Sequence, residues 1–547
     1  MPGGSDLSEP AAPADLSEPA DLSEPVVRLP GATCHELLRA VAAEHGDREA
    51  YVEATGQRMT FAEWDRAADG TAAAFADRGV GPGDVVTLLL PSSIDYAVCY
   101  LAAMRLGAIT SGINTRLGPA EVASILRRSR PRLVVGHRPE DDAAVAAWAG
   151  TVPAGTVPAG ATTYLSRGDL EGFRTAAPPA TLPEPDPDRP VAIVWTSGTT
   201  GEPKGAVFDH RNLAAVSVGA GALRGRFDRK ICPTPFSHVG YMVHVAEDIE
   251  YAITTVVPPT PWKAGPVLAL MAAERVTVGQ GVPSQWRLLL DRPELDDTDL
   301  SSLRICGSGA APAPPSLVRE LQQRLGCPVV IGYTSTEAAL TTGSLPGDSP
   351  ELIARTVGRR RDNVELRVVD DDAVPVPAGQ IGNVECRSAA VMRGYWEDPE
   401  KTAAVLRPDG WLRTGDGGWL DDDGYLTLVG RRTEMYLRGG YNVYPVEVER
   451  VVAELPEVAQ VGVVGKPDPV LGQIGVAFVV PAAGQPAPSL EQVRRQVRSA
   501  IADYKAPDLL EVVTELPLTA MGKVDKLTLG RLAEALPPPL RSRTGRS

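Results

Sequence analysis

The feature that most constrains this chain is a short apolar segment followed directly by a loop of glycine and hydroxyl residues. Residues 191–195 are apolar and rich in β-branched side chains, which predicts a buried strand. Residues 196–205 then contain three glycines, four hydroxyl side chains and Lys204. Glycine accepts positive φ, so successive N–H groups can point into one concavity and bind phosphate oxygens. We therefore expect this loop to hold the phosphates of a nucleotide.

The loop differs from the common phosphate-binding motif. No G-x-x-x-x-G-K-[ST] register fits Gly198 or Gly201. A flexible surface loop is the alternative interpretation, and the density of hydroxyl and N–H donors disfavours it. The residues expected to contact phosphate are Thr196, Ser197, Gly198, Thr199, Thr200, Gly201 and Lys204.

Length and composition indicate a soluble protein of more than one domain. A chain of 547 residues exceeds the size of a single compact core. The net charge of −15 argues against a general nucleic-acid binder, for which a basic face is expected. No apolar run of about eighteen residues and no signal pattern occur, so we expect no membrane span and a cytoplasmic location. The six cysteines form no C-x-x-C pair, which favours reduced structural thiols.

The pattern along the chain predicts an α/β fold with helix-covered sheets. A strand over 84–90, a helix from Ser92 to Gly107 and a strand over 108–113 form a β-α-β unit, and a helix over 119–128 and a strand over 132–135 repeat it. Beyond Gly430 the order of elements changes. We expect a helix from Pro445, two strands over 458–464 and 474–480, a helix over 490–504 and a strand over 510–513. These elements suffice for a small α+β domain of about 110 residues.

Five segments, in this order, carry a resemblance to a known family. They are residues 196–205, 332–337, 411–416, 430–431 leading to 439–445, and 517–526. Together they resemble the signatures of the adenylate-forming enzymes, which include acyl-CoA synthetases, peptide-synthetase adenylation domains and beetle luciferases. The resemblance covers nearly the whole chain and is closest to acyl- or aryl-CoA ligases.

The resemblance implies the domain organisation. We expect a disordered acidic leader over 1–27, where Asp-Leu-Ser-Glu-Pro occurs three times, and a large N-terminal domain of several subdomains over 28–432. A small mobile C-terminal lid over 433–540 and a tail over 541–547 follow. The duplicated Thr-Val-Pro-Ala-Gly at 151–160 is interpreted as a surface loop.

The resemblance also implies an activity that uses ATP, Mg²⁺ and coenzyme A. A carboxylic acid would attack the α-phosphate of ATP, and the acyl-adenylate would pass its acyl group to CoA. Lys523 would contact both the attacking carboxylate and the α-phosphate. Glu337 would bind Mg²⁺, and Thr336 would bind the α-phosphate.

The remaining nucleotide contacts come from three places in the sequence. Asp416 matches the acid that accepts the ribose hydroxyls, and Arg431 matches the arginine beside it. Tyr333 would stack on adenine. The backbone expected around the base belongs to Gly309, Ala310, Ala311, Gly332 and Thr334.

The resemblance also implies where the acid and the thiol bind. His238 resembles the residue at the junction of the acyl and thiol tunnels, and the residues expected around the acid are His238, Val239, Gly240, Tyr241, Val282, Trp286 and Thr334. The absence of Asp at Ser237 favours an acid without an amino group. The residues expected along the pantetheine arm of CoA are Arg438, Gly439, Gly440 and Tyr441.

Two positions depart from the family pattern. Thr334 stands where glycine is common, and its side chain should intrude on the acyl pocket. Thr433 occupies the hinge position, which is usually Asp or Lys. A hinge needs a change of φ/ψ and not a charge, so the second half-reaction is the step that this departure affects.

Alternatives stay open at this point. The acyl group could pass to a separate carrier protein, and a non-catalytic adenylate-binding protein is disfavoured by the presence of Lys523, Glu337 and Asp416. A homodimer is also open. The acid itself could be aromatic, fatty or polycyclic.

Overall fold

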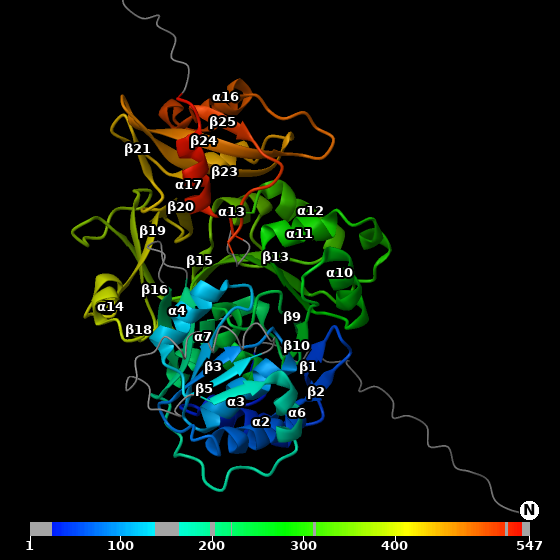
Figure 1. Ribbon diagram of the computed structural model, residues 1–547. Coiled ribbons are helices and arrows are strands. Elements are labelled where there is room, and N and C mark those ends of the chain that lie inside the picture. Colours follow the sequence, from blue (N-terminus) through cyan, green and yellow to red (C-terminus); the bar gives the residue numbers. More distant parts are fainter. Residues whose placement is uncertain are drawn as a thin grey trace, which may run out of the picture.

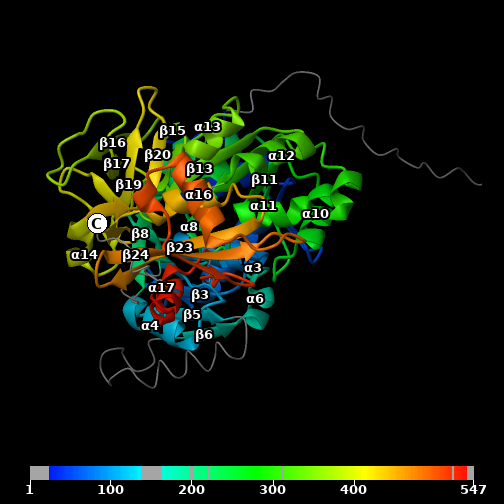
Figure 2. The same ribbon diagram turned by 90° about the horizontal axis from the view of Figure 1, so that it is seen from above.

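A computed structural model describes residues 24–136, 163–196, 203–219, 221–309, 313–519 and 523–538 (Figure 1). Three sheets with their helices form a large N-terminal domain, and one sheet with its helices forms a small C-terminal domain. Seen from above, the small domain covers the middle of the large one (Figure 2). This is the mixed α/β arrangement that the sequence predicts. Within the described ranges, no helix is long and apolar enough to cross a membrane.

The first sheet has seven strands in the order β18-β8-β7-β4-β3-β5-β6. Its strands are β3 (Val85–Leu89), β4 (Ile109–Gly112), β5 (Leu133–Gly136), β6 (Thr163–Ser166), β7 (Pro190–Thr196), β8 (Lys204–Asp209) and β18 (Gly394–Tyr395). The five strands from β7 to β6 are parallel, whereas β8 and β18 add antiparallel pairs at one edge. The predicted β-α-β unit is confirmed as β3, α3 (Ile94–Arg105) and β4. Ser93 caps α3, and Gly107 follows it at φ +64°.

The second sheet has nine strands in the order β15-β14-β13-β12-β11-β9-β10-β1-β2. Its strands are β1 (Glu49–Glu53), β2 (Arg58–Thr60), β9 (Arg229–Ile231), β10 (Thr254–Val257), β11 (Val278–Gly281), β12 (Ile305–Gly309), β13 (Val329–Ser335), β14 (Ala339–Gly343) and β15 (Arg359–Arg360). The six strands from β1 to β13 in this order are parallel. Loops at the carboxyl ends of β12 and β13 therefore meet at one edge, as ligand-binding loops do in parallel sheets.

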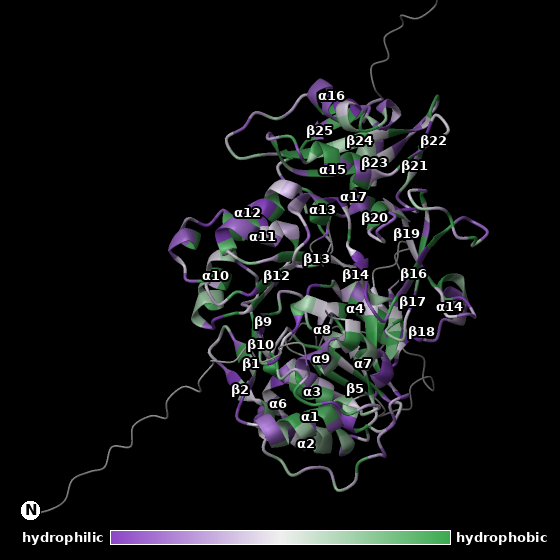
Figure 3. Cartoon of the chain, turned by 180° about the vertical axis from the view of Figure 1, so that it is seen from behind, coloured by the Kyte–Doolittle hydropathy of each residue, from purple (hydrophilic) through white to green (hydrophobic). Residues whose placement is uncertain are grey.

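A third sheet and the helices complete the large domain. The antiparallel strands are β16 (Glu365–Val369), β17 (Gly382–Arg387), β19 (Leu412–Leu420) and β20 (Leu426–Arg431). The other helices are α1 (Cys34–His45), α2 (Phe61–Ala76), α4 (Pro119–Ser129), α6 (Arg167–Phe173), α7 (His210–Gly219), α8 (Val239–Met242), α9 (Val245–Glu250), α10 (Ala264–Ala273), α11 (Pro283–Leu290), α12 (Pro315–Leu325), α13 (Pro350–Arg355) and α14 (Pro399–Val405), with 3-10 turns η1 (Gly221–Leu223) and η2 (Pro293–Asp297). The outer surface of α12 is hydrophilic, as is that of α16 in the small domain (Figure 3).

The small domain is built on β23 and β24. Its strands are β21 (Tyr436–Arg438), β22 (Tyr441–Val443), β23 (Val458–Asp468), β24 (Gly472–Pro481) and β25 (Leu509–Val512), and its helices are α15 (Pro445–Val452), α16 (Leu490–Ala500), α17 (Lys526–Ala535) and the 3-10 turn η3 (Asp503–Lys505). The helix predicted over 490–504 is wrong at its end. Ile501 is extended at φ −140° and ψ 177°, so α16 stops at Ala500 and η3 follows.

The predicted leader and loop lie partly outside the description. Residues 1–23 and the duplicated segment at 151–160 fall outside the described residues. The last four residues of the predicted leader, 24–27, are described: the Val26 N–H donates to the Glu250 carbonyl at 2.7 Å, and Val27 belongs to the large core. All six cysteines are buried and free.

Candidate functional site

The predicted phosphate loop connects two antiparallel strands. β7 ends at Thr196 and β8 begins at Lys204, and these two residues are paired in the register. Val191, Ala192, Ile193 and Val194 are buried, which confirms the predicted interior strand. Residues 197–202 lie outside the described residues, so the contacts of Ser197, Gly198, Thr199, Thr200 and Gly201 stay predictions.

Lys204 and Glu337 both contact one tyrosine, Lys204 at the ring and Glu337 at the hydroxyl. The Tyr395 hydroxyl donates to Glu337 Oε1 at 2.8 Å. The Lys204 Nζ atom lies 5.3 Å from the centroid of the Tyr395 ring. Tyr395 thus joins the end of the phosphate loop to the turn between β13 and β14, which carries Thr336 and Glu337. Sequence reasoning missed this residue, and its only signal was an aromatic side chain in a Gly-Tyr-Trp run.

A charged cluster joins the second and third sheets. Asp416 of β19 faces Arg431 of β20 in the register, with 3.4 Å between Asp416 Oδ1 and Arg431 Nε. The Tyr333 hydroxyl donates to Asp416 Oδ2. Burial raises the pKa of Asp416, and the charge of Arg431 opposes that rise. Burial alone would lower the pKa of Arg431, but Asp416 and Glu337 raise it. A buried carboxylate is therefore held between a guanidinium and a phenol.

Tyr333, which was predicted to stack on adenine, is largely buried. Its side chain is 8% exposed and packs with Val368, Val384 and Leu426. Gly309 and Gly332 are paired neighbours at the ends of β12 and β13, and a Cβ on Gly309 would lie 3.3 Å from the Gly332 carbonyl oxygen. Ala310 and Ala311 lie outside the described residues. Contact of these residues with adenine stays a prediction.

Lys523 of the small domain faces this cluster. Its side chain is accessible to solvent, yet enough protein surrounds it that burial lowers the pKa of Lys523, and Arg431 lowers it further. Asp416 and Glu337 oppose this effect. Burial also lowers the pKa of His238 to about 4, with the charge of Lys523 as the second cause. The His238 imidazole is therefore neutral at pH 7, and Lys523 lies near both the charged cluster and His238.

The loop that carries Lys523 is fixed at its base. The Thr519 N–H donates to the Lys523 carbonyl at 2.7 Å, and the Asp525 N–H donates to the Pro517 carbonyl at 2.8 Å. Asp525 then caps α17 through the N–H groups of Leu527 and Thr528. The ammonium of Lys526 is paired with Glu449, so this second lysine has a structural partner.

Three of the residues predicted to contact the acid, Val239, Tyr241 and Trp286, belong to the protein core. Tyr241 is 1% exposed, its hydroxyl lies 2.9 Å from that of Tyr51, and its ring stacks on Phe236. Trp286 is also 1% exposed and donates from Nε1 to the Gly307 carbonyl at 3.2 Å. His238 caps α8, where Nδ1 accepts the Gly240 N–H at 3.1 Å. Their contact with an acid, and that of Val239 and Val282, stays a prediction.

Thr334 lies on the surface, near the carboxyl end of β13 in the second sheet. Its residue is exposed, and it pairs with Leu340 next to a register shift at Tyr333. A hydroxyethyl group is therefore available to a ligand that approaches this edge.

The residues predicted to contact CoA form an exposed turn on the small domain. Gly439 and Gly440 connect β21 to β22 at φ +58° and +85°, a conformation that favours glycine. Arg438 makes two hydrogen bonds to Asp508, at 2.9 and 2.8 Å, and Tyr441 stacks on Tyr504. A Cβ on Gly440 would have no heavy atom within 4 Å.

One carboxylate near the phosphate loop fits a magnesium ion that is bound mainly by a substrate. Mg²⁺ in nucleotide sites is held by one or two carboxylates together with phosphate oxygens and water. Within the part of the chain that the structure describes, the Glu337 carboxylate accepts one hydrogen bond, at Oε1 from Tyr395. Among the described residues, no three His, Cys, Asp or Glu side chains form a metal-binding group. The donor set therefore suits a metal that enters with ATP and not one held by protein alone.

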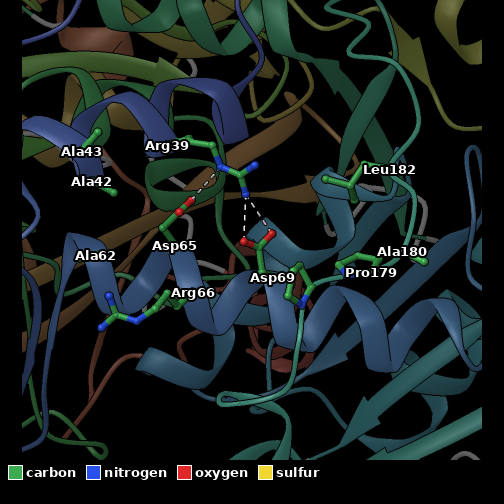
Figure 4. Close-up of a pocket in the computed structure, with 11 residues that line it drawn as sticks. Arg39, Ala42, Ala43, Ala62, Asp65, Arg66, Asp69, Pro179, Ala180 and Leu182 are labelled. Atoms are coloured by element: carbon green, nitrogen blue, oxygen red, sulfur yellow. Dashed lines mark hydrogen bonds and ion pairs between the residues drawn. The ribbon is translucent and has the colours of Figure 1, made fainter.

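A cavity of about 600 Å³ is lined by none of these residues (Figure 4). It is lined by α1, α2 and residues 178–182. Arg39 crosses it to Asp69 with two contacts of 3.0 and 2.9 Å, and the buried Arg105 pairs with Asp65 and Asp69. Arg39 and Arg105 thus pair with the two carboxylates, Asp65 and Asp69, and none of the lining residues was predicted to be functional.

Comparison with known proteins shows that the chain belongs to a known enzyme family. The model of the AMP-binding enzyme family matches residues 38–396, and the AMP-binding enzyme C-terminal domain matches residues 447–523. The chain is 33% identical over 506 residues to the long-chain-fatty-acid–CoA ligase FadD13 of Mycobacterium tuberculosis, with 92% of this chain and 99% of the relative covered. It is 34% identical over 501 residues to a feruloyl-CoA synthase of Amycolatopsis sp, with 89% and 94% covered.

A solved structure is similar over the same extent. The anthranilate CoA ligase AuaEII in complex with anthranoyl-AMP superposes with a TM-score of 0.84 at 28% identity, covering 92% of this chain and 98% of that one. The similarity therefore extends over both domains.

The contacts of Asp416 generate a prediction about nucleotide affinity. Asp416→Ala should weaken ATP binding by at least ~10²-fold if Asp416 binds the ribose as the sequence predicts, because two charge-assisted hydrogen bonds of about 1.5–3 kcal/mol each would be lost. Calorimetric titration with ATP measures this. Asp348→Ala is the matched control, since Asp348 also accepts a tyrosine hydroxyl, from Tyr425 at 2.7 Å. An unchanged ATP affinity in Asp416→Ala would exclude the ribose assignment.

Proposed function

Because this chain belongs to the AMP-binding enzyme family, we propose that it is an acyl-CoA ligase that forms AMP and pyrophosphate. A carboxylate oxygen of the acid attacks the α-phosphorus of ATP, and the bond to pyrophosphate breaks. The CoA thiol then attacks the acyl carbonyl, and AMP leaves. The observation that carries this proposal is that the charge of Lys523, on the small domain, interacts with Asp416, Glu337 and His238 of the large domain.

Each step needs a different group of residues. Asp416 and Arg431 hold the ribose, and Lys204 with the phosphate loop holds the β- and γ-phosphates. Bound Mg²⁺, held by Glu337 and phosphate oxygens, would supply neutralising charge where pyrophosphate departs. Lys523 lies between the carboxylate and the α-phosphate, where an ammonium reduces the repulsion between two anions. The neutral His238 offers no charge to the acid side of the site.

The acid is the open part of this proposal. The relatives carry names that refer to a long-chain fatty acid and to a feruloyl group, which differ in shape and polarity. A panel of aliphatic, aromatic and polycyclic acids, assayed for pyrophosphate release, identifies the substrate class. CoA-dependent loss of the acid then separates a CoA ligase from an enzyme that serves a carrier protein. A cytoplasmic location, a homodimer and a carrier-protein partner stay predictions of the sequence.

The charge interactions of Lys523 support assigning the described arrangement to the first half-reaction. Lys523 faces the large domain, while the Gly439–Gly440 turn is exposed. Both cannot occupy the same site, so thiol transfer requires rotation of the small domain about the segment that follows Arg431. Thr433 is exposed in that segment and can change its backbone dihedrals without losing a buried contact.

Lys523→Ala should slow adenylate formation by at least ~10²-fold, because one preorganised charge at the reacting phosphate is lost. Transfer from a supplied acyl-adenylate to CoA should stay largely intact. Pyrophosphate release and acyl-CoA formation are measured separately. Lys505→Ala is the control, since this lysine is bound to Glu447 at 2.8 Å on the same domain. Equal loss of both half-reactions in Lys523→Ala would contradict the alternation.

Gly440→Leu should do the reverse and block thiol transfer, because a side chain would fill the path of the pantetheine arm. Pyrophosphate release in a single turnover should stay near normal. Gly484→Leu is the matched control, since Gly484 has φ +75° and no heavy atom within 4 Å of its Cβ position. If both glycine variants lose thiol transfer equally, backbone strain and not the CoA path explains the effect.

Thr334→Gly should broaden the range of acids accepted, because it removes a side chain at the edge that faces the acid. A change of one or two groups in a pocket shifts selectivity by about 1–3 kcal/mol. The relative kcat/KM values for the acid panel provide the measurement. An identical acid profile before and after would show that Thr334 does not contact the acid.

A further inference from the structure

Tyr395 lies between two residues of the proposed ATP site that are far apart in the sequence. It belongs to β18 and is paired with Ala206 of β8, two positions from Lys204. The side chain is 7% exposed. Its hydroxyl donates to Glu337 Oε1 at 2.8 Å, and its ring centroid lies 5.3 Å from Lys204 Nζ. One buried side chain therefore contacts both a phosphate-loop lysine and the carboxylate beside it.

The backbone around Tyr395 is bonded to the same two segments. The Met392 N–H donates to the Glu337 carbonyl at 2.8 Å, and the Trp396 N–H donates to the Gly205 carbonyl at 2.7 Å. The Tyr395 N–H donates to Thr402 Oγ1 at 2.8 Å, which ties β18 to α14. The tyrosine thus has a fixed base from which its side chain can set the positions of both neighbours.

Each contact restrains one charged group in a defined way. A carboxylate that accepts a hydroxyl at Oε1 keeps Oε2 available for another ligand, and its rotamer is limited. An ammonium over a tyrosine ring is attracted by the electron-rich face. Burial, and then the charge of Glu337, raises the pKa of Tyr395, so the phenol stays protonated and remains a donor over the physiological range.

We propose that Tyr395 is a positioning residue that sets the spacing between the metal-binding carboxylate of Glu337 and the phosphate-binding ammonium of Lys204. This inference rests on the proposed function, since it takes the roles of those two residues from there. Tyr395 itself does not touch the reacting atoms. Its hydroxyl acts through Glu337 on magnesium, and its ring acts through Lys204 on the phosphates.

The first test separates the hydroxyl from the ring. Tyr395→Phe removes the bond to Glu337 and keeps the ring beneath Lys204. We expect it to raise the Mg²⁺ concentration needed for half-maximal stabilisation by ATP roughly 10-fold, as expected for loss of one hydrogen bond to a charged group. The measurement is the melting temperature at fixed ATP and varied Mg²⁺, without acid or CoA.

The chain contains a matched control for this substitution. The Tyr425 hydroxyl donates to Asp348 at 2.7 Å, and Arg359 lies over its ring at 4.4 Å. Tyr425→Phe therefore loses an equivalent bond and keeps an equivalent cation–π contact away from the site. It should leave the Mg²⁺ dependence unchanged. A shift of equal size in Tyr425→Phe would overturn the inference, because loss of any such bond would then suffice.

A double-substitution cycle tests whether Tyr395 acts through Glu337. In a Glu337→Gln background, Tyr395→Phe should have no further effect on the Mg²⁺ dependence. General loss of stability is common to both backgrounds and cancels in the cycle. An equal shift in both backgrounds would overturn the positioning role.

The ring has its own test. Tyr395→Leu should weaken ATP binding about 3-fold beyond Tyr395→Phe, and this difference should vanish in a Lys204→Ala background. If Tyr395→Leu and Tyr395→Phe bind ATP equally in the presence of Lys204, the contact with Lys204 has no role in positioning.

Failure of this inference and failure of the proposed function give different results. If Mg²⁺ and ATP do not stabilise the unsubstituted protein at all, the proposed function is wrong and the inference falls with it. If they stabilise it and Tyr395→Phe shows the same Mg²⁺ dependence, only the role of Tyr395 is excluded.

Discussion

The buried contact of Asp416 with Arg431 and Tyr333 is the interaction on which the rest of the site depends. A carboxylate inside a protein is costly unless it is paired and hydrogen-bonded. Asp416 of β19 and Arg431 of β20 are paired in the third sheet, and the Tyr333 hydroxyl that donates to Asp416 comes from β13 of the second sheet. The contact therefore fixes how these two sheets meet. Because the chain leaves the large domain directly after Arg431, it also fixes where the small domain begins its path.

The edge of the first sheet is completed by a segment from much later in the chain. β18 pairs with β8, so residues near position 395 extend the sheet that carries the phosphate loop. The same segment bonds to the turn after β13 through Met392 and Tyr395. The first and second sheets are thus connected next to Lys204 and Glu337. A phosphate site formed at such a junction gains its geometry from both sheets, which a single loop could not provide.

The small domain contributes the charge of Lys523 to this junction, while its Gly439–Gly440 turn, which we propose binds CoA, is exposed. Lys523 stands among groups of both signs, and its pKa is lowered by burial and by Arg431 although Asp416 and Glu337 oppose the change. The Gly439–Gly440 turn meanwhile has space around it. An enzyme that must handle ATP and a thiol in turn can use this separation, because each arrangement of the domains brings one surface to the site.

The sequence by itself determined the elements whose signals are local. The strand over 191–195, the β-α-β unit from 84 to 113 and the helix–strand–strand–helix–strand order from 445 to 513 followed from apolar periodicity, caps and glycines, and the five motifs indicated the family. The short strands β21 and β22 and the helix α17 were not predicted. Boundaries were less certain: the helix predicted over 490–504 ends at Ala500, where Ile501 is extended, and the strand predicted over 458–464 continues to Asp468. The sequence predicted that Asp416 and Arg431 act together, and in the structure the two residues are paired across β19 and β20.

Only the tertiary structure decided that Tyr333 bonds to Asp416, 83 positions away, and that Tyr395 bonds to Glu337, 58 positions away. It also decided that Tyr241 and Trp286 are core residues with satisfied polar atoms. The reason is physical: periodicity and turn chemistry depend on neighbours in the chain, whereas hydrogen bonds between sheets depend on how the sheets pack.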